Sequence, residues 1–145
     1  MAGPLSGVKI LEFSQIIAAP FSGMLLADMG ADVIKVEHPD GEPWRLNQQI
    51  VPKESKSFIA LNRGKRSLPL DMTQPQALKI VHQLLPEVDV VLINYRPDVP
   101  QKLGIDYESL AAINPKIIYA SGSGYGPLGP DSGKPALDSA AQARS

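Results

Sequence analysis

Short apolar runs alternate along the chain with segments whose apolar positions recur every three or four residues. The first two runs, Val8–Phe13 and Asp32–Glu37, are rich in β-branched residues and predict strands. Between them Phe21, Leu25 and Met29 recur at helical spacing. Proline is tolerated in the first turn of a helix, where Pro20 stands, and glycine commonly caps the last turn, where Gly30 stands. The pattern predicts a strand, a helix and a second strand.

The next segments continue this alternation. Arg66–Met72 reads as a short extended piece, and Pro69 favours an edge or irregular strand. Thr73 and Gln76 form the capping-box pattern T-x-x-Q in front of a helix. The apolar positions of that helix trace one face: Ala77, Ile80, Val81, Leu84 and Leu85.

The last elements complete the prediction of the fold class. Val88–Ile93 is apolar at nearly every position, as is typical of a parallel strand buried on both sides. Asp106 caps a short helix, "YESLAAIN", and Lys116–Ala120 forms the next strand. Alternating strands and helices imply an α/β protein, with a mainly parallel sheet covered by helices on both faces.

Ligands of such sheets gather outside the carboxyl ends of the strands. The segments that follow the predicted strands are therefore the candidate site: Ser14–Ala19, His38–Arg45, Leu70–Thr73, Asn94–Lys102 and Ser121–Asp138.

Composition removes several function classes. The chain has 145 residues, 43% hydrophobic and 20% charged, and 14 basic and 15 acidic residues give a formal net charge of −1. Such a balance creates no field that would attract a nucleic acid or an anionic membrane. There is no cysteine, which excludes disulfides and thiolate metal sites. No run approaches the ~20 apolar residues of a membrane span, so we expect a soluble, cytoplasmic domain.

The segment Gly122–Pro135 holds five glycines and three prolines, a density that prevents regular structure. A helix-forming composition resumes after it and stops within a few residues, so we expect a fragment, with a domain over 1–121 and a loop and truncated helix over 122–145. "GYGPLG" matches the dinucleotide pattern G-x-G-x-x-G, but the prolines forbid the helix that this site needs. "GPDSGKP" likewise lacks a Ser or Thr after Lys134, so neither segment predicts a phosphate loop.

Charged and titratable residues leave two alternatives open. His82 is expected to be a solvated surface histidine, whereas His38 is either a loop residue or a ligand contact; two histidines in unrelated settings predict no metal site. "NRGKRS", residues 62–67, is either a solvated turn or an anion site. Arg96 and Lys102 follow a buried strand, and two cationic loops at one sheet edge would suit a polyanionic ligand.

The chain also resembles the class III CoA-transferases, the family of formyl-CoA and carnitine CoA-transferases and α-methylacyl-CoA racemases. Almost the entire chain takes part in the resemblance. It is carried by "PLSGVKILEFSQIIAAPFSGMLLADMGADVIKVEHPDGEPWR", "LNRGKRSLPLDM", "VDVVLINYRPDVPQKLGIDYESLAAINPKIIYASGSGYGPLGP" and "ALDSAAQA".

The resemblance implies that a Rossmann-like domain, the N-terminal part of a larger CoA-transferase fold, binds coenzyme A. His38 stands where some members have an arginine, and Lys134 lies one place before a lysine of such members. The CoA contacts that the resemblance implies are Ile17, Ala18, His38, Leu70, Asp71, Met72, Thr73, Asn94, Tyr95, Arg96, Lys102, Pro135, Ala136 and Leu137.

The implied reaction moves CoA between an acyl-CoA and a carboxylic acid through an aspartyl anhydride. The nucleophile of the family lies in a downstream "GD" motif beyond residue 145, so Asp138 is expected to be an auxiliary acid and the fragment to be inactive. The racemase branch has a histidine where this chain has Leu137, which disfavours that alternative. Ile17 replaces a glutamine of formyl-CoA transferase and favours a less polar acid than oxalate or formate. A CoA-binding module without catalysis is the remaining alternative.

The resemblance also implies the partners of the complete protein. Acyl-CoA and a carboxylic acid are substrates, no cofactor is tightly bound, and no metal is required. Family members form interlocked homodimers, so a chain that ends at Ser145 should expose apolar surface.

Overall fold

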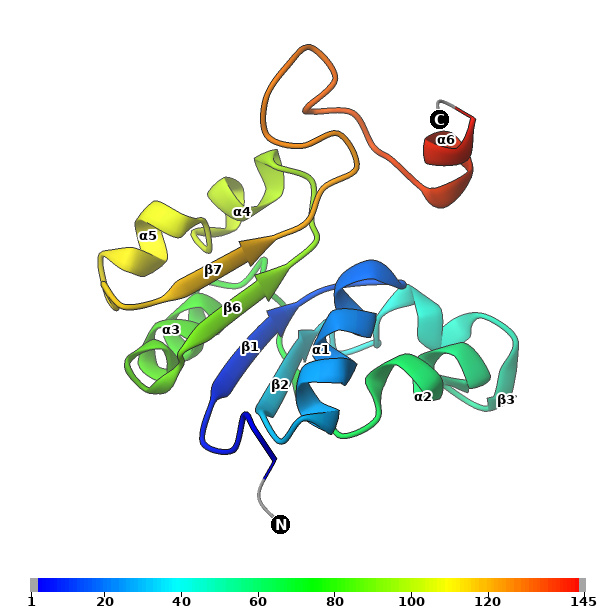
Figure 1. The fold of residues 1–145 in the computed structure, drawn as a ribbon, viewed down its shortest axis with the longest axis horizontal. Helices are drawn as coiled ribbons and strands as arrows, with labels where there is room; N and C mark the ends of the chain where they lie inside the picture. Colours follow the sequence, from blue (N-terminus) through cyan, green and yellow to red (C-terminus); the bar gives the residue numbers. More distant parts are fainter. Residues whose placement is uncertain (1–2, 144–145) are drawn as a thin grey trace.

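The computed structural model describes residues 3–143, and a five-stranded sheet forms its centre (Figure 1). The strands lie in the order β5-β2-β1-β6-β7, and every neighbouring pair is parallel. Sequence reasoning therefore predicted the α/β class and the parallel sheet correctly, and β5 lies at an edge, as Pro69 indicated. The strands are β1 (Lys9–Phe13), β2 (Asp32–Glu37), β5 (Arg66–Pro69), β6 (Val90–Ile93) and β7 (Ile118–Ser121).

Helices cover the two faces of the sheet unequally. α1 (Ala18–Asp28) packs on one face, where Ile10, Val33 and Leu92 form the smaller core cluster with Ala19. On the other face lie α3 (Pro75–Leu84), α4 (Asp98–Leu103) and α5 (Tyr107–Ala111). The larger cluster fills this second face and consists of Leu11, Phe13, Val36, Val81, Leu85, Val88, Val91, Ile93, Ile105, Leu110 and Ile117. Alternate residues of β1 thus point into different cores.

Most of the predicted helix ends are present. Pro20 lies in the first turn of α1, and Gly30 follows the helix with a φ of 101°. Asp106 caps α5, because its carboxylate accepts a hydrogen bond from the Ser109 N–H at 3.1 Å. The capping box at Thr73 is wrong. The Thr73 hydroxyl donates to the Asp71 carboxylate instead, and α3 begins at Pro75 without a side-chain cap.

The crossover between β2 and β5 holds elements that the sequence analysis did not predict. A 3-10 turn, η1 (Pro43–Leu46), leads to a small antiparallel hairpin of β3 (Gln49–Val51) and β4 (Glu54–Ser55). Helix α2 (Lys56–Asn62) follows, and the Ser55 hydroxyl caps it by accepting from the Phe58 N–H at 3.0 Å. A further 3-10 turn, η2 (Leu85–Glu87), joins α3 to β6.

The glycine- and proline-rich segment has no helix or strand between Gly122 and Leu137. It leads away from β7 to α6 (Asp138–Gln142), which Figure 1 shows apart from the sheet and its helices. This agrees with the rejection of a dinucleotide site at "GYGPLG", because no helix opens there. Within residues 3–143, no helix is long and apolar enough to cross a membrane.

Candidate functional site

An open cleft of about 430 Å³ lies at the carboxyl ends of the strands. Four segments meet in it: the turn after β1, the loop after β2, the loop after β5 and the start of the connection after β6. The residues predicted at this edge that line the cleft are His38, Leu70, Asp71, Met72, Thr73, Asn94, Tyr95 and Arg96.

The sheet topology explains the position of this cleft. β1 and β6 are neighbours in the sheet, but the chain leaves β1 for α1 on one face and leaves β6 for α4 on the other. The two connections diverge, and such switch points are where open α/β sheets bind ligands.

The cleft combines an apolar wall with a polar rim. Val36, Leu70 and Met72 line it with further apolar residues from α4, and His38 and Arg96 add cationic or titratable groups. An arrangement of this kind can accept a flat apolar group and an attached anion. Burial, helped by the charge of Glu42, raises the pKa of Tyr95 to about 12. The phenol therefore stays neutral and can donate a hydrogen bond at physiological pH.

The two cations after β6 share one carboxylate. Lys102 Nζ lies 2.8 Å and Arg96 Nε 3.7 Å from Asp98 oxygens. The hydrogen bond from Lys102 lowers the pKa of Asp98 and the charges of both cations reinforce this shift, although desolvation opposes it. Lys102 belongs to the last turn of α4 and does not line the cleft, while Arg96 does.

Local hydrogen bonds shape the two loops opposite. Asp71 accepts from both the N–H and the hydroxyl of Thr73, and the hydroxyl contact is the main cause of a lowered pKa at Asp71. His38 accepts a hydrogen bond at Nδ1 from the Asp40 N–H at 3.2 Å. Both side chains are thus oriented by their own loops.

The other predicted site residues lie elsewhere. Ile17 is exposed at the N-cap of α1, and Ala18 lines a second open cleft of about 300 Å³ beside β6 and β7. Pro135, Ala136, Leu137 and Asp138 lie in the segment that leads to α6, and none of them lines the large cleft. The Asp138 carboxylate accepts a hydrogen bond from Gln142 at 2.7 Å.

The anion site considered at "NRGKRS" is wrong. Arg63 donates to Asp28, Arg66 to Asp32, and Lys65 forms a buried ion pair with Glu12. The segment also runs into β5, whose first residue is Arg66, so it lies at the opposite end of that strand from the cleft. The three cations that suggested a phosphate site stabilise the fold instead.

His82 also departs from the expectation of a solvated surface residue. Its side chain is half-buried, and the Nε2 atom is shielded from solvent without a hydrogen-bond partner among residues 3–143.

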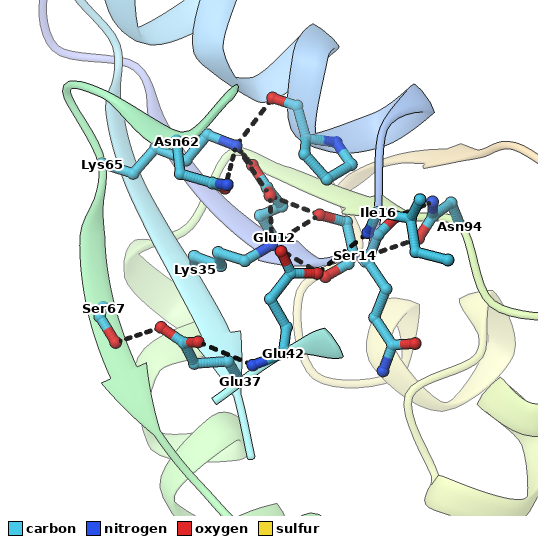
Figure 2. Close-up of polar contacts among 12 residues, drawn as sticks. Glu12, Ser14, Ile16, Lys35, Glu37, Glu42, Asn62, Lys65, Ser67 and Asn94 are labelled. Carbon is cyan, nitrogen blue, oxygen red and sulfur yellow. Dashed lines mark hydrogen bonds and ion pairs between the residues drawn. The ribbon is translucent and has the colours of Figure 1, made fainter. Parts of the chain in front are cut away.

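Sequence reasoning missed a buried polar cluster between α1 and the sheet (Figure 2). Glu12 is fully buried, and both Lys35 and Lys65 pair with its carboxylate, at 3.2 and 2.9 Å. Lys35 also donates to the Ser14 carbonyl at 2.9 Å, and Lys65 donates to Asn62 at 3.0 Å. Burial lowers the pKa of Lys65, although the Glu12 charge opposes that shift. The sequence feature that could have indicated this cluster is the presence of Glu12 and Lys35 inside two otherwise mainly apolar strands.

Two further carboxylates continue this cluster toward the cleft. Glu37 receives two hydrogen bonds from Arg45, both 2.7 Å, and one from Ser67 at 2.6 Å. Burial alone would raise the pKa of Glu37, but these contacts outweigh it and leave the pKa below its ordinary value. Glu42 has no such cation in contact, and burial raises its pKa. Among the described residues, no group of three or more His, Asp or Glu side chains could hold a metal ion.

Comparison with known proteins identifies relatives over nearly the whole chain. A model of CoA-transferase family III matches residues 5–145. The succinate–glutarate CoA-transferase of Agrobacterium fabrum is 42% identical over 135 residues, which are 88% of this chain and 34% of that protein. The acetyl-CoA:oxalate CoA-transferase of Acetobacter aceti is 38% identical, over 99% of this chain and 37% of that protein.

A solved structure agrees with these relatives. A CaiB/BaiF family protein from Brucella suis superimposes with a TM-score of 0.92 at 40% identity, over 99% of this chain and 39% of that one. The chain thus spans little more than a third of the length of the relatives that it matches.

Proposed function

This chain belongs to CoA-transferase family III, and we propose that it forms the CoA-binding part of an enzyme that moves CoA between an acyl-CoA and a carboxylic acid. The observation that carries the proposal is the large cleft. Eight of the residues that the resemblance assigns to CoA, from three separate loops, line this one cavity. Relatives named for glutarate and oxalate transfer support the reaction class.

The cleft suits the nucleotide end of CoA. Its apolar wall, which includes Leu70 and Met72, can contact the adenine ring, and Arg96 can meet a phosphate at the rim. Lys102 lies in the last turn of α4 and can reach a second phosphate, because its side chain is 71% exposed and, among residues 3–143, forms an ion pair with Asp98 alone. CoA is then a substrate that enters and leaves, without any tightly bound cofactor.

The chemistry that we propose at the thioester uses an aspartate beyond this chain, as the resemblance implies. In the proposed reaction an aspartate carboxylate attacks the thioester carbonyl, the carbon–sulfur bond breaks, and CoA leaves as a thiolate while an acyl-aspartyl anhydride forms. The nucleophile must be held within roughly 3–3.5 Å of that carbon. Asp138 is exposed on a helix of five residues and hydrogen-bonded to Gln142. In line with the resemblance, we assign it an auxiliary role and place the nucleophile beyond Ser145.

The direct test is transferase activity of the complete gene product that contains this chain. Incubation with succinyl-CoA and glutarate, the pair suggested by the relatives, should form glutaryl-CoA, detected by mass spectrometry. Hydroxylamine should trap an acyl-aspartyl adduct at an aspartate beyond residue 145, and the 1–145 segment alone should give neither product. Epimerisation without CoA transfer would favour the racemase alternative, and CoA binding without turnover would favour a binding module.

The contribution of the rim can be tested separately. Arg96→Ala and Lys102→Ala should each weaken CoA binding by about 1–3 kcal/mol in calorimetry, the range for a hydrogen bond to a charged group. Lys116→Ala is the matched control, because this exposed lysine lies at the opposite end of the sheet. If Arg96→Ala and Lys102→Ala both bind CoA as tightly as wild type and Lys116→Ala do, neither residue belongs to the site. Tight binding of NAD without binding of CoA would overturn the proposed function itself.

A further inference from the structure

The turn between β1 and α1 has an unusual backbone conformation. Ile16 has a φ of 68°, in the left-handed region. Gln48 and Lys53 are the other non-glycine residues with positive φ in the described chain, so Ile16 is the only β-branched one. A branched side chain strongly disfavours this region, and such strain persists only where the surroundings enforce it.

Glu42 supplies one enforcing contact. It is 2% exposed, and its Oε2 accepts a hydrogen bond from the Ile16 N–H at 2.9 Å. The second carboxylate oxygen, Oε1, is buried without a hydrogen-bond partner among residues 3–143. The backbone N–H of Glu42 donates to Glu37 at 3.2 Å, which anchors the residue to the end of β2. The Glu42 carboxylate is therefore directed at the turn.

Asn94, from the end of β6, holds the preceding residue. Its Oδ1 accepts from the Gln15 N–H at 2.9 Å, and its Nδ2 donates to the Gln15 carbonyl at 2.8 Å. The Ser14 carbonyl is held in turn by Lys35. Figure 2 shows these side chains converging on the turn from three different elements. Three consecutive residues of the turn thus have backbone groups bound by side chains far away in the sequence.

We propose that Glu42 and Asn94 are positioning residues, which hold the β1–α1 turn in its left-handed conformation for ligand binding. The conformation of the turn matters for ligand binding because Gln15 lines the large cleft and Ala18 lines the second cleft. Both polar ends of the Asn94 side chain are bound by Gln15, so Asn94 can act on the ligand through the turn, in addition to lining the cleft itself. The identity of the ligand rests on the proposed function, whereas the mechanical role does not.

A double-mutant cycle in the complete gene product tests the role of Glu42. An L-residue such as Ile disfavours the left-handed conformation by a factor of about 5 to 30. Glycine adopts positive and negative φ about equally. Glu42→Ala should therefore weaken CoA binding about 5- to 30-fold in the wild-type background. In an Ile16→Gly background, the same change should cost about 2-fold or less.

Conservative variants separate positioning from loss of structure. Glu42→Gln keeps an oxygen that can accept from the Ile16 N–H, so its CoA affinity should stay within about 3-fold of wild type. Glu87→Ala is the control acid, because Glu87 is exposed at the opposite end of the sheet. All variants are compared at a temperature well below their unfolding midpoints.

Hydrogen exchange of the Ile16 amide provides a readout that needs no ligand. Glu42→Ala and Asn94→Ala should each accelerate exchange at Gln15 and Ile16 while leaving β2 amides unchanged. Faster exchange in a protein that does not bind CoA would support the positioning role and refute the proposed function. Unchanged exchange, or equal losses of affinity from Glu42→Ala in both backgrounds, would overturn the inference.

Discussion

Lys35 and Lys65 each have side chains only 2% exposed, and both are matched to the fully buried Glu12 carboxylate. The sequence alone does not show which lysines form buried ion pairs, because a lysine in a strand or turn can either pair with a buried carboxylate or face solvent. "NRGKRS" shows the consequence. Its glycine and cations resemble an anion site, but acceptors on β1, α1 and β2 bind all three cations. These acceptors are up to 53 residues away in sequence.

Loss of Arg45 should destabilise the fold, because this side chain is paired with a buried carboxylate. Its guanidinium binds the nearly buried Glu37 with two hydrogen bonds and lies 3.7 Å from the centre of the Phe58 ring. Arg45→Met should destabilise the complete gene product by about 3–5 kcal/mol in urea unfolding, because it leaves a buried carboxylate unpaired. Arg45→Lys should also destabilise it, by less, since lysine cannot bind with two parallel bonds or stack.

Arg63 offers a matched control for this change. It pairs with Asp28 on the surface, where both side chains are about half exposed. Arg63→Met should therefore cost at most about 1 kcal/mol. Similar losses for Arg45→Met and Arg63→Met would contradict the distinction between the two ion pairs.

The raised pKa of Glu42 predicts that this residue makes the free energy of unfolding fall as pH rises, whereas most carboxylates make it increase. Burial raises its pKa in the fold, so the folded state binds this proton more tightly than the unfolded chain does. As pH rises from the ordinary glutamate pKa through the raised one, ionisation of Glu42 therefore destabilises the fold. The charged or titratable groups that face it are Lys35, Glu37, Arg45, Lys65 and Tyr95.

Glu42→Gln, which stays neutral, isolates this effect. The free energy of unfolding of the variant minus that of wild type should increase as pH rises above about 4.5 and become constant above the raised pKa. A series of urea titrations between pH 4 and pH 8 measures the difference. A difference that is constant or falls with pH would show that Glu42 does not titrate as described.

At the scale of elements, α1 is present as predicted but rotated relative to its apolar pattern. Phe21, Leu25 and Met29 are 47, 42 and 39% exposed, whereas Ala19, Pro20, Gly23 and Met24 are buried. The helix is apolar on nearly all sides, so the spacing of large residues could not identify the packed face. The buried side of the helix includes Gly23, which lies directly against the Glu12–Lys65 pair.

Gly23 is the position where α1 approaches this pair most closely. A Cβ added at Gly23 would lie 1.9 Å from Glu12 Oε2 and 3.2 Å from Lys65 Nζ. Gly23→Ala should therefore destabilise the protein by about 1–3 kcal/mol through overpacking, despite a gain in helix propensity of ~1 kcal/mol. Thermal unfolding measures the change. Ser22→Ala, on the exposed side of the same helix turn, is the control, and a stabilising Gly23→Ala would refute the close approach.

The other elements that the sequence predicted are those whose apolar residues follow a recognisable strand or helix pattern. β1, β2 and α3 have distinct apolar patterns. The structure contains β1 and β2 within one residue of the predicted bounds, and α3 contains most of its predicted apolar positions. η1, the β3–β4 hairpin and α2 have no such pattern, and Ile50 and Val51 of the hairpin are about half exposed. The large cleft was predictable because strand ends mark it. The contacts of Glu42 and Asn94 with the turn were not, because they depend on tertiary structure.

At the scale of the whole molecule, apolar side chains remain exposed on the α1 side. They belong to α1, to the adjacent α2 and to the edge strand β7, where Ile118 is 62% exposed. Isolated exposed apolar residues are ordinary, whereas a row of them on one helix is typical of a surface that contacts another protein segment or partner. That the complete protein is an interlocked homodimer stays a prediction.

Leu25→Gln tests whether the α1 surface is covered in the complete gene product. If it is, the substitution should destabilise that protein by about 1 kcal/mol or more, because it places a polar group in an apolar contact. Sedimentation would then show whether the same change weakens a dimer. Ile50→Gln on the hairpin is the control and should be nearly neutral; equal effects at both positions would indicate that α1 stays exposed.

The pairing of Asn94 with Gln15 also has a consequence for how this protein folds. The two residues are 79 positions apart, and β1 has β6 as one of its two neighbours in the sheet. Contacts of such long sequence separation form slowly, because a large loop must close before they stabilise the chain. During synthesis on the ribosome, the ligand edge cannot assemble until β6 has emerged. Until then β1 has only β2 beside it, and the backbone groups on its other edge stay without strand partners.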